Sequence, residues 1–258
     1  MNELIVLHLT SSFFMLFLGA SIGSFLNVVA IRYKNKQNFI SGRSVCPSCK
    51  NPLNFPDLIP IISWLILLGR CRFCKTKISP QYIIVEITTA IIFVLSLYTF
   101  GFTFLTPFSI IVSSILMTIA LIDFETMEIP DKLNISLIPF AILLIFLQPS
   151  PNLLSRGIGI FVVALPMFAL ALIINGAFGG GDIKLMAVAG FLLGWQNTIL
   201  AFFIAILIGG SYAIFLLAAC KGKKGQQIVF GPALCFGIFI SLLYGNDILS
   251  WYLDLLMF

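Results

Sequence analysis

The sequence predicts an all-α polytopic membrane protein with about eight transmembrane helices and a small polar loop domain between helices 1 and 2. The first observation behind this prediction is composition: 60% of the 258 residues are hydrophobic and 10% are charged, whereas soluble domains carry about 25% charged residues. The second is that the apolar residues form runs close to the length of about 20 residues that crosses a bilayer. This composition excludes a soluble enzyme, and the abundance of Phe, Leu and Ile excludes an intrinsically disordered chain.

Eight runs are candidate spans. They cover about 4–31, 82–100, 102–122, 133–147, 154–174, 183–193, 198–219 and 233–244. The last stretch, 248–258, is too short to span and is expected to lie at the membrane interface. The first run is expected to remain as a helix, because Glu3 precedes it and its basic residues follow it, the reverse of a cleavable signal peptide.

Basic residues set the expected orientation, because they accumulate on the cytoplasmic side of membrane proteins. Nine of the fifteen lie between the first two spans, against the single acid Asp57: Arg32, Lys34, Lys36, Arg43, Lys50, Arg70, Arg72, Lys75 and Lys77. With this segment in the cytoplasm and eight spans, five further bases are also cytoplasmic: Lys132, Lys184, Lys221, Lys223 and Lys224. Arg156 is the one basic residue that this orientation places outside the cytoplasm. The other fourteen agree with the orientation, and their agreement supports the number of spans.

The basic loop contains two Cys-x-x-Cys pairs, Cys46 with Cys49 and Cys71 with Cys74. Four thiolates at about this spacing form a tetrahedral zinc site. Disulfide or redox roles are the alternative, which a reducing cytoplasm disfavours. The loop has only about 50 residues, so a metal would supply folding free energy that a small core cannot. The apolar segment 57–64 between the pairs either dips into the membrane interface or packs on the pairs. Cys220 and Cys235 are expected to be small buried hydrophobes.

Two acids at the edges of spans are candidate catalytic residues, because ionisable groups there are costly. Asp123 ends the third run, and Asp182 follows Gly179, Gly180 and Gly181; the predicted orientation places both acids at one depth on one side. Two neighbouring carboxylates share one proton, so the ionised group can deprotonate water while the protonated group polarises a carbonyl. This is aspartyl-protease chemistry, and the three glycines would let an extended substrate strand approach.

Other interpretations stay open. The glycine turn resembles an anion site at a helix start but lacks the Gly-Lys-Ser/Thr ending of a phosphate loop. Asp131 fits an ordinary acidic helix start, and Glu125 and Glu128 fit solvated turns. Glu86 is a structural group, a loop anchor or a substrate contact, and Lys184 either lowers a neighbour's pKa or extends to the interface. Two other classes of protein also stay open. A cation-coupled transporter with a zinc-binding loop would place acids deep within spans, and an assembly scaffold of the same fold is a third class.

Motifs along almost the whole chain resemble the type IV prepilin peptidase family, the bifunctional leader peptidase/N-methyltransferases among GxGD-type membrane aspartyl proteases. The matching segments are 23–29, 60–64, 69–71, 78–82, 123–131, 179–185 and 230–233, together with both cysteine pairs and Glu86. The resemblance implies that Asp123 and Asp182 are the catalytic pair. It implies a multi-pass protein of the bacterial cytoplasmic (inner) membrane whose active site faces the cytoplasm.

The resemblance also implies the substrates. They would be prepilins or pseudopilins of type IV pilus or secretion systems, cut after the Gly that ends a short basic leader. The new N-terminus would then be methylated with S-adenosylmethionine, unless this member retains only the peptidase. The division would be a first transmembrane helix at 1–31, a zinc-binding methyltransferase loop at 32–81 and a peptidase core at 82–258. The basic loop would face anionic membrane lipid, and no nucleic-acid partner is expected.

Overall fold

The computed structural model describes residues 2–37, 44–46, 48–148, 150–174, 176–219 and 229–256. The described chain is helical, with isolated bridges but no strand in these ranges. It divides into two compact units, Met1–Thr106 and Pro107–Phe258. Predictions for Arg43, Cys220, Lys221, Lys223 and Lys224 fall outside the described residues.

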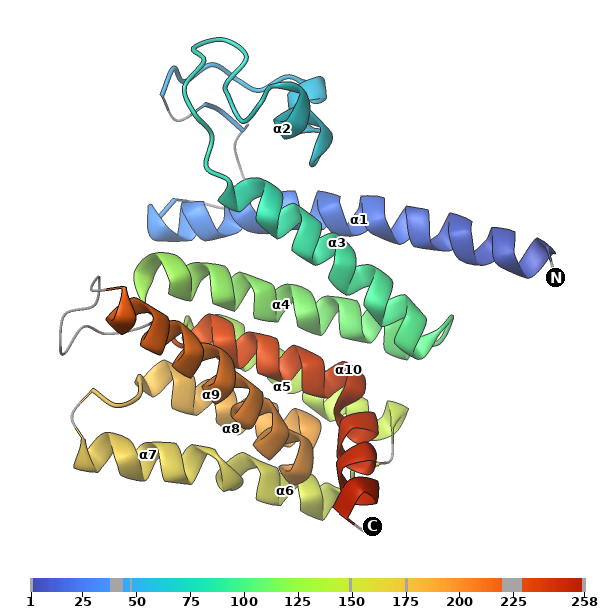
Figure 1. Ribbon diagram of the computed structural model, residues 1–258, viewed down its shortest axis with the longest axis vertical. Helices are drawn as coiled ribbons and strands as arrows, with labels where there is room; N and C mark the ends of the chain where they lie inside the picture. Colours follow the sequence, from blue (N-terminus) through green and yellow to red (C-terminus); the bar gives the residue numbers. More distant parts are fainter. Residues whose placement is uncertain are drawn as a thin grey trace. The chain divides into compact units, whose positions relative to one another are not determined.

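The first unit contains two long helices, α1 (Asn2–Lys34) and α3 (Gln81–Phe100), joined by the polar loop (Figure 1). The loop holds a 3-10 turn, η1 (Phe55–Leu58), and a short helix, α2 (Ile62–Ile66). Close packing of α1 on α3 depends on small residues, as is common between membrane helices. A Cβ on Gly19 would lie 2.7 Å from the Cα of Ala90, and one on Gly23 would lie 3.0 Å from the Cα of Glu86.

The second unit consists of α5 (Asp131–Leu147), α6 (Leu153–Val162), α7 (Ala164–Ile173), α8 (Gly180–Leu193), α9 (Trp195–Ala218) and α10 (Gly231–Leu256), with nearly all of α4 (Leu105–Thr126). Helix α8 is the central helix of this unit, because it packs against α5, α6, α7, α9 and α10. The α6 and α8 backbones meet at Gly159 and Gly190, where a Cβ on either residue would overlap the other's carbonyl. This central position surrounds much of α8 with other helices, and Asp182 at its start is half-buried.

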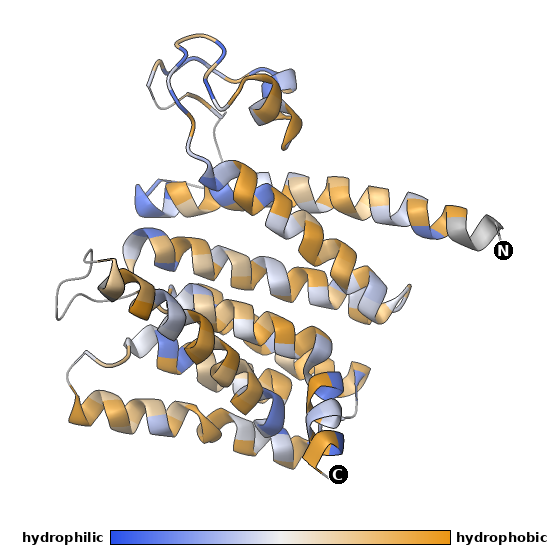
Figure 2. Ribbon diagram, in the orientation of Figure 1, coloured by the Kyte–Doolittle hydropathy of each residue, from blue (hydrophilic) through white to orange (hydrophobic). Residues whose placement is uncertain are grey.

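All eight predicted runs lie on helices. Among the described residues, six helical segments are long and apolar enough to cross a membrane, with α6 and α7 together forming one of them. Helices α5 and α8 are shorter, at 17 and 14 residues. Apolar residues extend along the helices of both units in Figure 2. The chain is therefore an all-α multi-pass membrane protein.

Two boundaries differ from the sequence prediction. The fifth predicted run is divided at Val163 into two helices, α6 and α7. The division occurs because a proline ring at position 166 clashes with the carbonyl four residues earlier, at Val162. Helix α10 continues past the predicted end of the eighth run as far as Leu256, so residues 248–256, which were expected at the membrane interface, belong to the same helix. Asn246, just beyond the predicted end of the eighth run, lies within this helix, and the Asn197 amide of α9 donates to its side chain at 3.1 Å.

Candidate active site and metal centre

Asp123 lies in the last turn of α4 and is buried, with 5% of its surface exposed. A carboxylate is unfavourable at the C-terminal end of its own helix, where the helix dipole is negative. The start of α10 compensates for this, because the N–H of Gly231 donates to Asp123 Oδ2 at 2.9 Å. The positive end of one helix therefore faces the acid at the negative end of another.

Asp182 lies in the first turn of α8, the favourable end for an acid. Its Oδ2 accepts a hydrogen bond from the N–H of Gly179 at 3.2 Å. The Asp123 and Asp182 carboxyl groups are near enough to interact electrostatically. The structure thus brings together the two acids that the sequence paired, and each accepts a glycine N–H at a helix start.

The three glycines before Asp182 have different surroundings. A Cβ on Gly181 would lie 2.8 Å from the Cβ of Ile129, so this glycine allows the turn after α4 to pack on α8. A Cβ on Gly179 would lie 3.1 Å from Asp182 Oδ2. A Cβ on Gly180 would meet no atom within 4 Å. Of the three, Gly180 has the open space that an approaching strand needs.

The other acids near α8 have different partners. Lys184 Nζ lies 2.9 and 3.0 Å from the two carboxylate oxygens of Asp131, which joins the start of α5 to α8. Both side chains are 60% exposed, so the pair contributes little to stability. The sequence did not reveal this pair, since its members are 53 positions apart. Glu128 is exposed and Glu125 is half-buried.

The two cysteine pairs occupy turns of the same construction. The N–H of Cys46 donates to Asn51 O at 3.0 Å, and the N–H of Cys71 donates to Thr76 O at 2.9 Å. In each turn the lysine after the second cysteine has a positive φ, 60° at Lys50 and 59° at Lys75. Each turn is closed by an antiparallel bridge, Val45 with Pro52 and Arg70 with Lys77. The chain therefore presents two matching thiol hairpins.

The four sulfur atoms of Cys46, Cys49, Cys71 and Cys74 all lie within 4.8 Å of one another. The sulfurs of Cys46 and Cys74 are 3.8 Å apart, which is about the separation in a tetrahedral centre with metal–sulfur bonds of about 2.3 Å. All four are free thiols rather than disulfides. This donor set could hold a metal ion, as the sequence predicted.

The surroundings of the thiols differ. Hydrogen bonds with Thr76 lower the pKa of Cys74 to about 6, and a backbone hydrogen bond at Cys49 lowers the pKa of Cys46. The Asn51 backbone lowers the pKa of Cys49, but burial and the neighbouring thiols outweigh it and raise that pKa to about 11.

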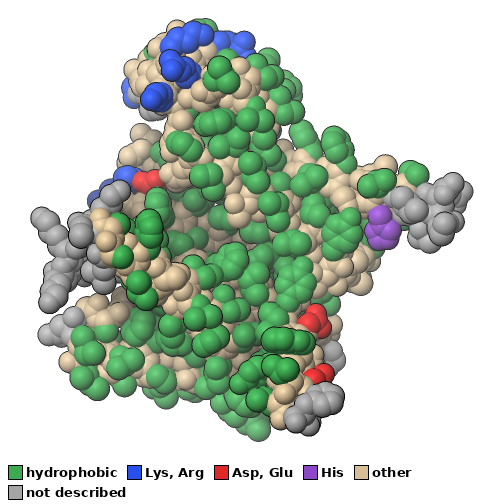
Figure 3. All heavy atoms as spheres, in the orientation of Figure 1, with side chains coloured by type: hydrophobic (Ala, Val, Ile, Leu, Met, Phe, Trp, Pro, Cys, Tyr) green, Lys and Arg blue, Asp and Glu red, His purple; other side chains and the backbone are tan. Residues whose placement is uncertain are grey.

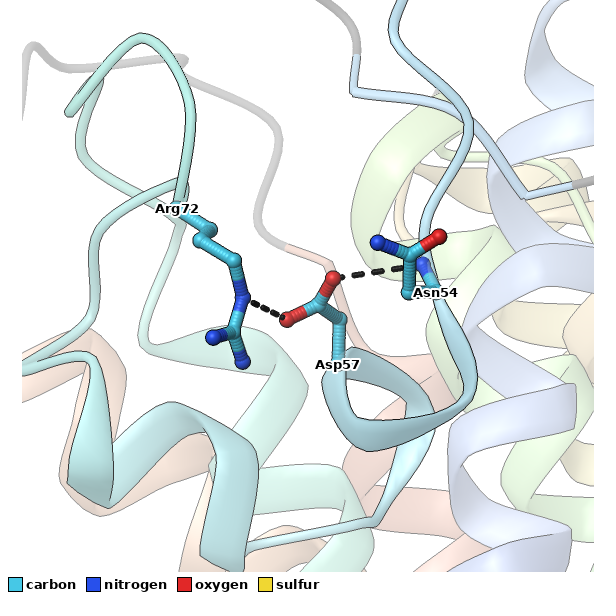
Figure 4. Close-up of polar contacts among 3 residues, drawn as sticks. All are labelled: Asn54, Asp57 and Arg72. Carbon is cyan, nitrogen blue, oxygen red and sulfur yellow. Dashed lines mark hydrogen bonds and ion pairs between the residues drawn. The ribbon is translucent and has the colours of Figure 1, made fainter.

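The rest of the loop is fixed by two carboxylates. Asp57 Oδ1 accepts from Arg72 Nε at 2.7 Å and its Oδ2 accepts from the N–H of Asn54 at 3.2 Å, which joins η1 to the second cysteine turn (Figure 4). The buried carboxylate of Glu86, on α3, accepts the N–H of Ile61 at 2.7 Å. Ile61 has a φ of 63°, a strained value for a β-branched residue. Glu86 is thus an anchor between the loop and a membrane helix.

The apolar segment of the loop is only partly packed. The Trp64 ring lies against Gly69, where a Cβ would be 2.7 Å from the ring, whereas Ile62 and Ile66 are exposed. In Figure 3 the Lys and Arg side chains gather on the loop that follows α1. The loop surface therefore carries both basic and apolar side chains.

Comparison with known proteins identifies the family. Residues 17–100, which include the four cysteines, match the Bacterial Peptidase A24 N-terminal domain. Residues 110–214, which include Asp123 and Asp182, match the Type IV leader peptidase family. The chain is 33% identical over 237 residues to a prepilin leader peptidase/N-methyltransferase of Bacillus subtilis, covering 92% of this chain and 96% of the relative. The chain belongs to the prepilin leader peptidase/N-methyltransferase family.

Relatives from other bacteria have similar coverage. A protein of the same name from Aeromonas salmonicida is 31% identical, over 92% of this chain and 91% of the relative. Another from Pseudomonas aeruginosa is 29% identical, over 92% of this chain and 91% of the relative. No solved structure matches the chain. As a prepilin leader peptidase/N-methyltransferase family member, the chain is a membrane-embedded enzyme of a protease family.

Proposed function

We propose that this chain is an aspartyl endopeptidase that removes the leader peptide from type IV prepilins and pseudopilins and then methylates the new N-terminus. The observation that carries the proposal is the placement of Asp123 and Asp182, which interact electrostatically and each accept a glycine N–H at a helix start. The names of the relatives support the substrate class.

In the proposed cleavage, the two carboxyl groups share one proton, because two neighbouring carboxylates do not both ionise readily. The ionised group takes a proton from water as the water oxygen bonds to the scissile carbonyl carbon. The protonated group donates to the carbonyl oxygen. The tetrahedral intermediate then breaks its C–N bond as the nitrogen gains a proton. The products are a leader ending in a Gly carboxylate and a pilin with a free amine.

The open space at Gly180 suits an extended leader segment. Asp123, Asp182 and Gly231 lie at helix ends rather than in mid-helix, which suits a cut where the pilin chain leaves the bilayer. The basic residues Lys132 and Lys184, close to this end in sequence, favour the cytoplasmic side of the bacterial inner membrane for it. The pilin's apolar helix would stay in lipid while its leader reaches the two acids.

For the second reaction, the new pilin amine bonds to the methyl carbon of S-adenosylmethionine as the carbon–sulfur bond breaks. A proton leaves to water, and S-adenosylhomocysteine is the other product. We assign this step to the unit that carries the cysteine loop. The four sulfurs have the donor type and spacing of a structural zinc site, and bound zinc would cross-link the two hairpins.

The decisive experiment is processing of a prepilin whose leader ends in Gly, by the purified full-length protein in lipid nanodiscs with a labelled methyl donor. Mass spectrometry of the products is expected to show cleavage after Gly and one added methyl group. Cleavage without the methyl group would identify a peptidase that has lost methylation. Absence of cleavage in protein that binds the prepilin would favour a scaffold. Proton-coupled flux in liposomes would favour a transporter.

Removing the metal is expected to separate the two activities. A chelator, or Cys46→Ser, should release the metal from the loop and reduce methylation at least about tenfold, because changing the residues around a bound metal typically costs about 10- to 100-fold in metal affinity or activity. Cleavage should stay within about twofold, since the catalytic acids belong to the other unit. Metal content by mass spectrometry and both activities are measured on one preparation. Equal loss of both activities would contradict the assignment of the loop to methylation alone.

Glu86→Ala is expected to impair methylation and spare cleavage. The change leaves the N–H of Ile61 without its acceptor, at a cost of about 1–3 kcal/mol, so the loop loses its anchor on α3. Glu86→Gln keeps an acceptor oxygen and should retain more methylation than the Ala variant. Equal methylation in the wild type and the Ala variant would show that Glu86 does not hold the loop.

A further inference from the structure

The Phe-Gly-Pro element at 230–232 is a sequence motif to which neither activity has yet given a role. It forms the start of α10: the carbonyl of Phe230 accepts the N–H of Leu234 at 3.1 Å, and Gly231 is the first helical residue. The first N–H groups of a helix have no partner within it, and Pro232 has no N–H at all. The Gly231 N–H is therefore free to bind a group from elsewhere, and it binds Asp123.

Only glycine fits at position 231. A Cβ there would overlap the Asp123 carboxylate and would lie 2.8 Å from its Cγ. Any side chain would therefore move the start of α10 or the last turn of α4. The contact joins residues 108 positions apart and is buried.

The turns that hold the two acids also touch each other. Phe230, directly before Gly231, packs on Phe178, directly before Gly179, with ring centroids 5.8 Å apart at 53°. Both rings also pack against residues of α9. Phe178 packs on Phe202 at 6.2 Å. A Cβ on Gly209 would be 2.8 Å from the ring of Phe230.

We propose that Gly231 is a positioning residue for proteolysis, and that the Phe178–Phe230 contact sets the separation of the Asp123 and Asp182 carboxylates. The Phe-Gly-Pro element is then the third part of the catalytic centre, beside the acid of α4 and the glycine turn of α8. The inference rests on the proposed function, since it requires Asp123 and Asp182 to be the catalytic pair.

The test is Gly231→Ala in the full-length protein in nanodiscs, with prepilin cleavage measured as separate kcat and KM. Displacement of a catalytic group by about 1 Å costs about 100-fold, so kcat is expected to fall about 100-fold while KM stays within about threefold. The thermal unfolding midpoint and methylation of a mature pilin peptide report whether the variant is folded.

Two neighbouring glycines of α9 provide a matched pair if Gly231→Ala does not fold. Gly209→Ala pushes on the Phe230 ring, whereas a Cβ on Gly210 would meet no atom within 4 Å. An aromatic contact is worth about 2- to 13-fold in rate when converted from its free energy. Gly209→Ala should therefore lower kcat by about that factor, and Gly210→Ala should leave it unchanged.

The outcomes separate this inference from the proposed function. Cleavage in Asp123→Asn or Asp182→Asn would overturn the catalytic pair itself. If those variants are inactive while folded Gly231→Ala keeps the wild-type kcat, the pair stands and the positioning role is overturned. If Gly231→Ala is unfolded, equal kcat values for the Gly209→Ala and Gly210→Ala variants overturn it.

Discussion

Asp123→Asn and Asp182→Asn are each expected to reduce leader-peptide cleavage by about 10²- to 10⁴-fold, the usual contribution of general acid–base catalysis. Asn is nearly the size of Asp and keeps an oxygen that can accept the N–H of Gly231 or Gly179. It cannot take a proton from water or give one to a carbonyl. A loss of activity in folded protein would therefore report chemistry rather than packing. Cleavage is measured by mass spectrometry over a time course, with the variants in nanodiscs.

Asp131→Asn is the matched control for this pair of variants. Asp131 belongs to the same segment as Asp123, but it is exposed and paired with Lys184, and such surface pairs contribute about 0–1 kcal/mol. Its cleavage rate should remain within about threefold of the wild type. Methylation of a mature pilin peptide should persist in all three variants. A fully active Asp182→Asn with an inactive Asp131→Asn would assign the second acid to Asp131 instead.

The helices outside the loop were predictable because each follows an apolar run, and such runs are a local property of the sequence. At two points, the helix boundaries could not be predicted from the neighbouring residues alone. The helix break at Val163 depends on one proline ring, and within α10 Asn246 is paired with Asn197, 49 positions away. Gly245 and Asn246 resemble turn residues when only their neighbours in sequence are considered.

The candidate site divides in the same way. The cysteine pairs and the Gly-Gly-Gly-Asp segment are local patterns whose chemistry follows from residue type and spacing, so the sequence could single them out. The hydrogen bond from Gly231 to Asp123 and the pair of Lys184 with Asp131 join distant segments. A sequence without homologues to compare contains no local signal for them. The late Phe-Gly-Pro motif was visible, but its role depends on where α10 begins in space.

Arg156 is the clearest case of a residue whose sequence context misleads. It is the one basic residue that the predicted orientation places outside the cytoplasm, and the structure gives a reason for the exception. The side chain is fully buried in the second unit. Its guanidinium donates to four backbone carbonyls: Gln148 at 3.3 Å, Pro151 at 3.1 Å, Phe191 at 3.3 Å and Leu192 at 2.7 Å. Arg156 therefore contacts protein rather than either membrane surface.

Three of these four carbonyls belong to places where helices end. Phe191 and Leu192 lie in the last turn of α8, and Gln148 caps α5. The last carbonyls of a helix lack partners within it and carry its negative dipole end. A buried cation with five N–H donors satisfies several of them at once. Arg156 thus fixes the end of the helix whose start carries Asp182.

Arg156→Met is accordingly expected to destabilise the protein by about 3–5 kcal/mol, because it keeps the aliphatic stem but leaves buried carbonyls without donors. The thermal unfolding midpoint in detergent should fall by about 10 °C. Arg156→Lys keeps the charge but not the planar fork, so its midpoint should lie between the Met variant and the wild type. Lys132→Met removes an exposed base and should leave the midpoint unchanged. If the Met variant has the same unfolding midpoint as the wild type, the carbonyls at the end of α8 are satisfied without Arg156. The stability of the second unit then does not depend on this side chain.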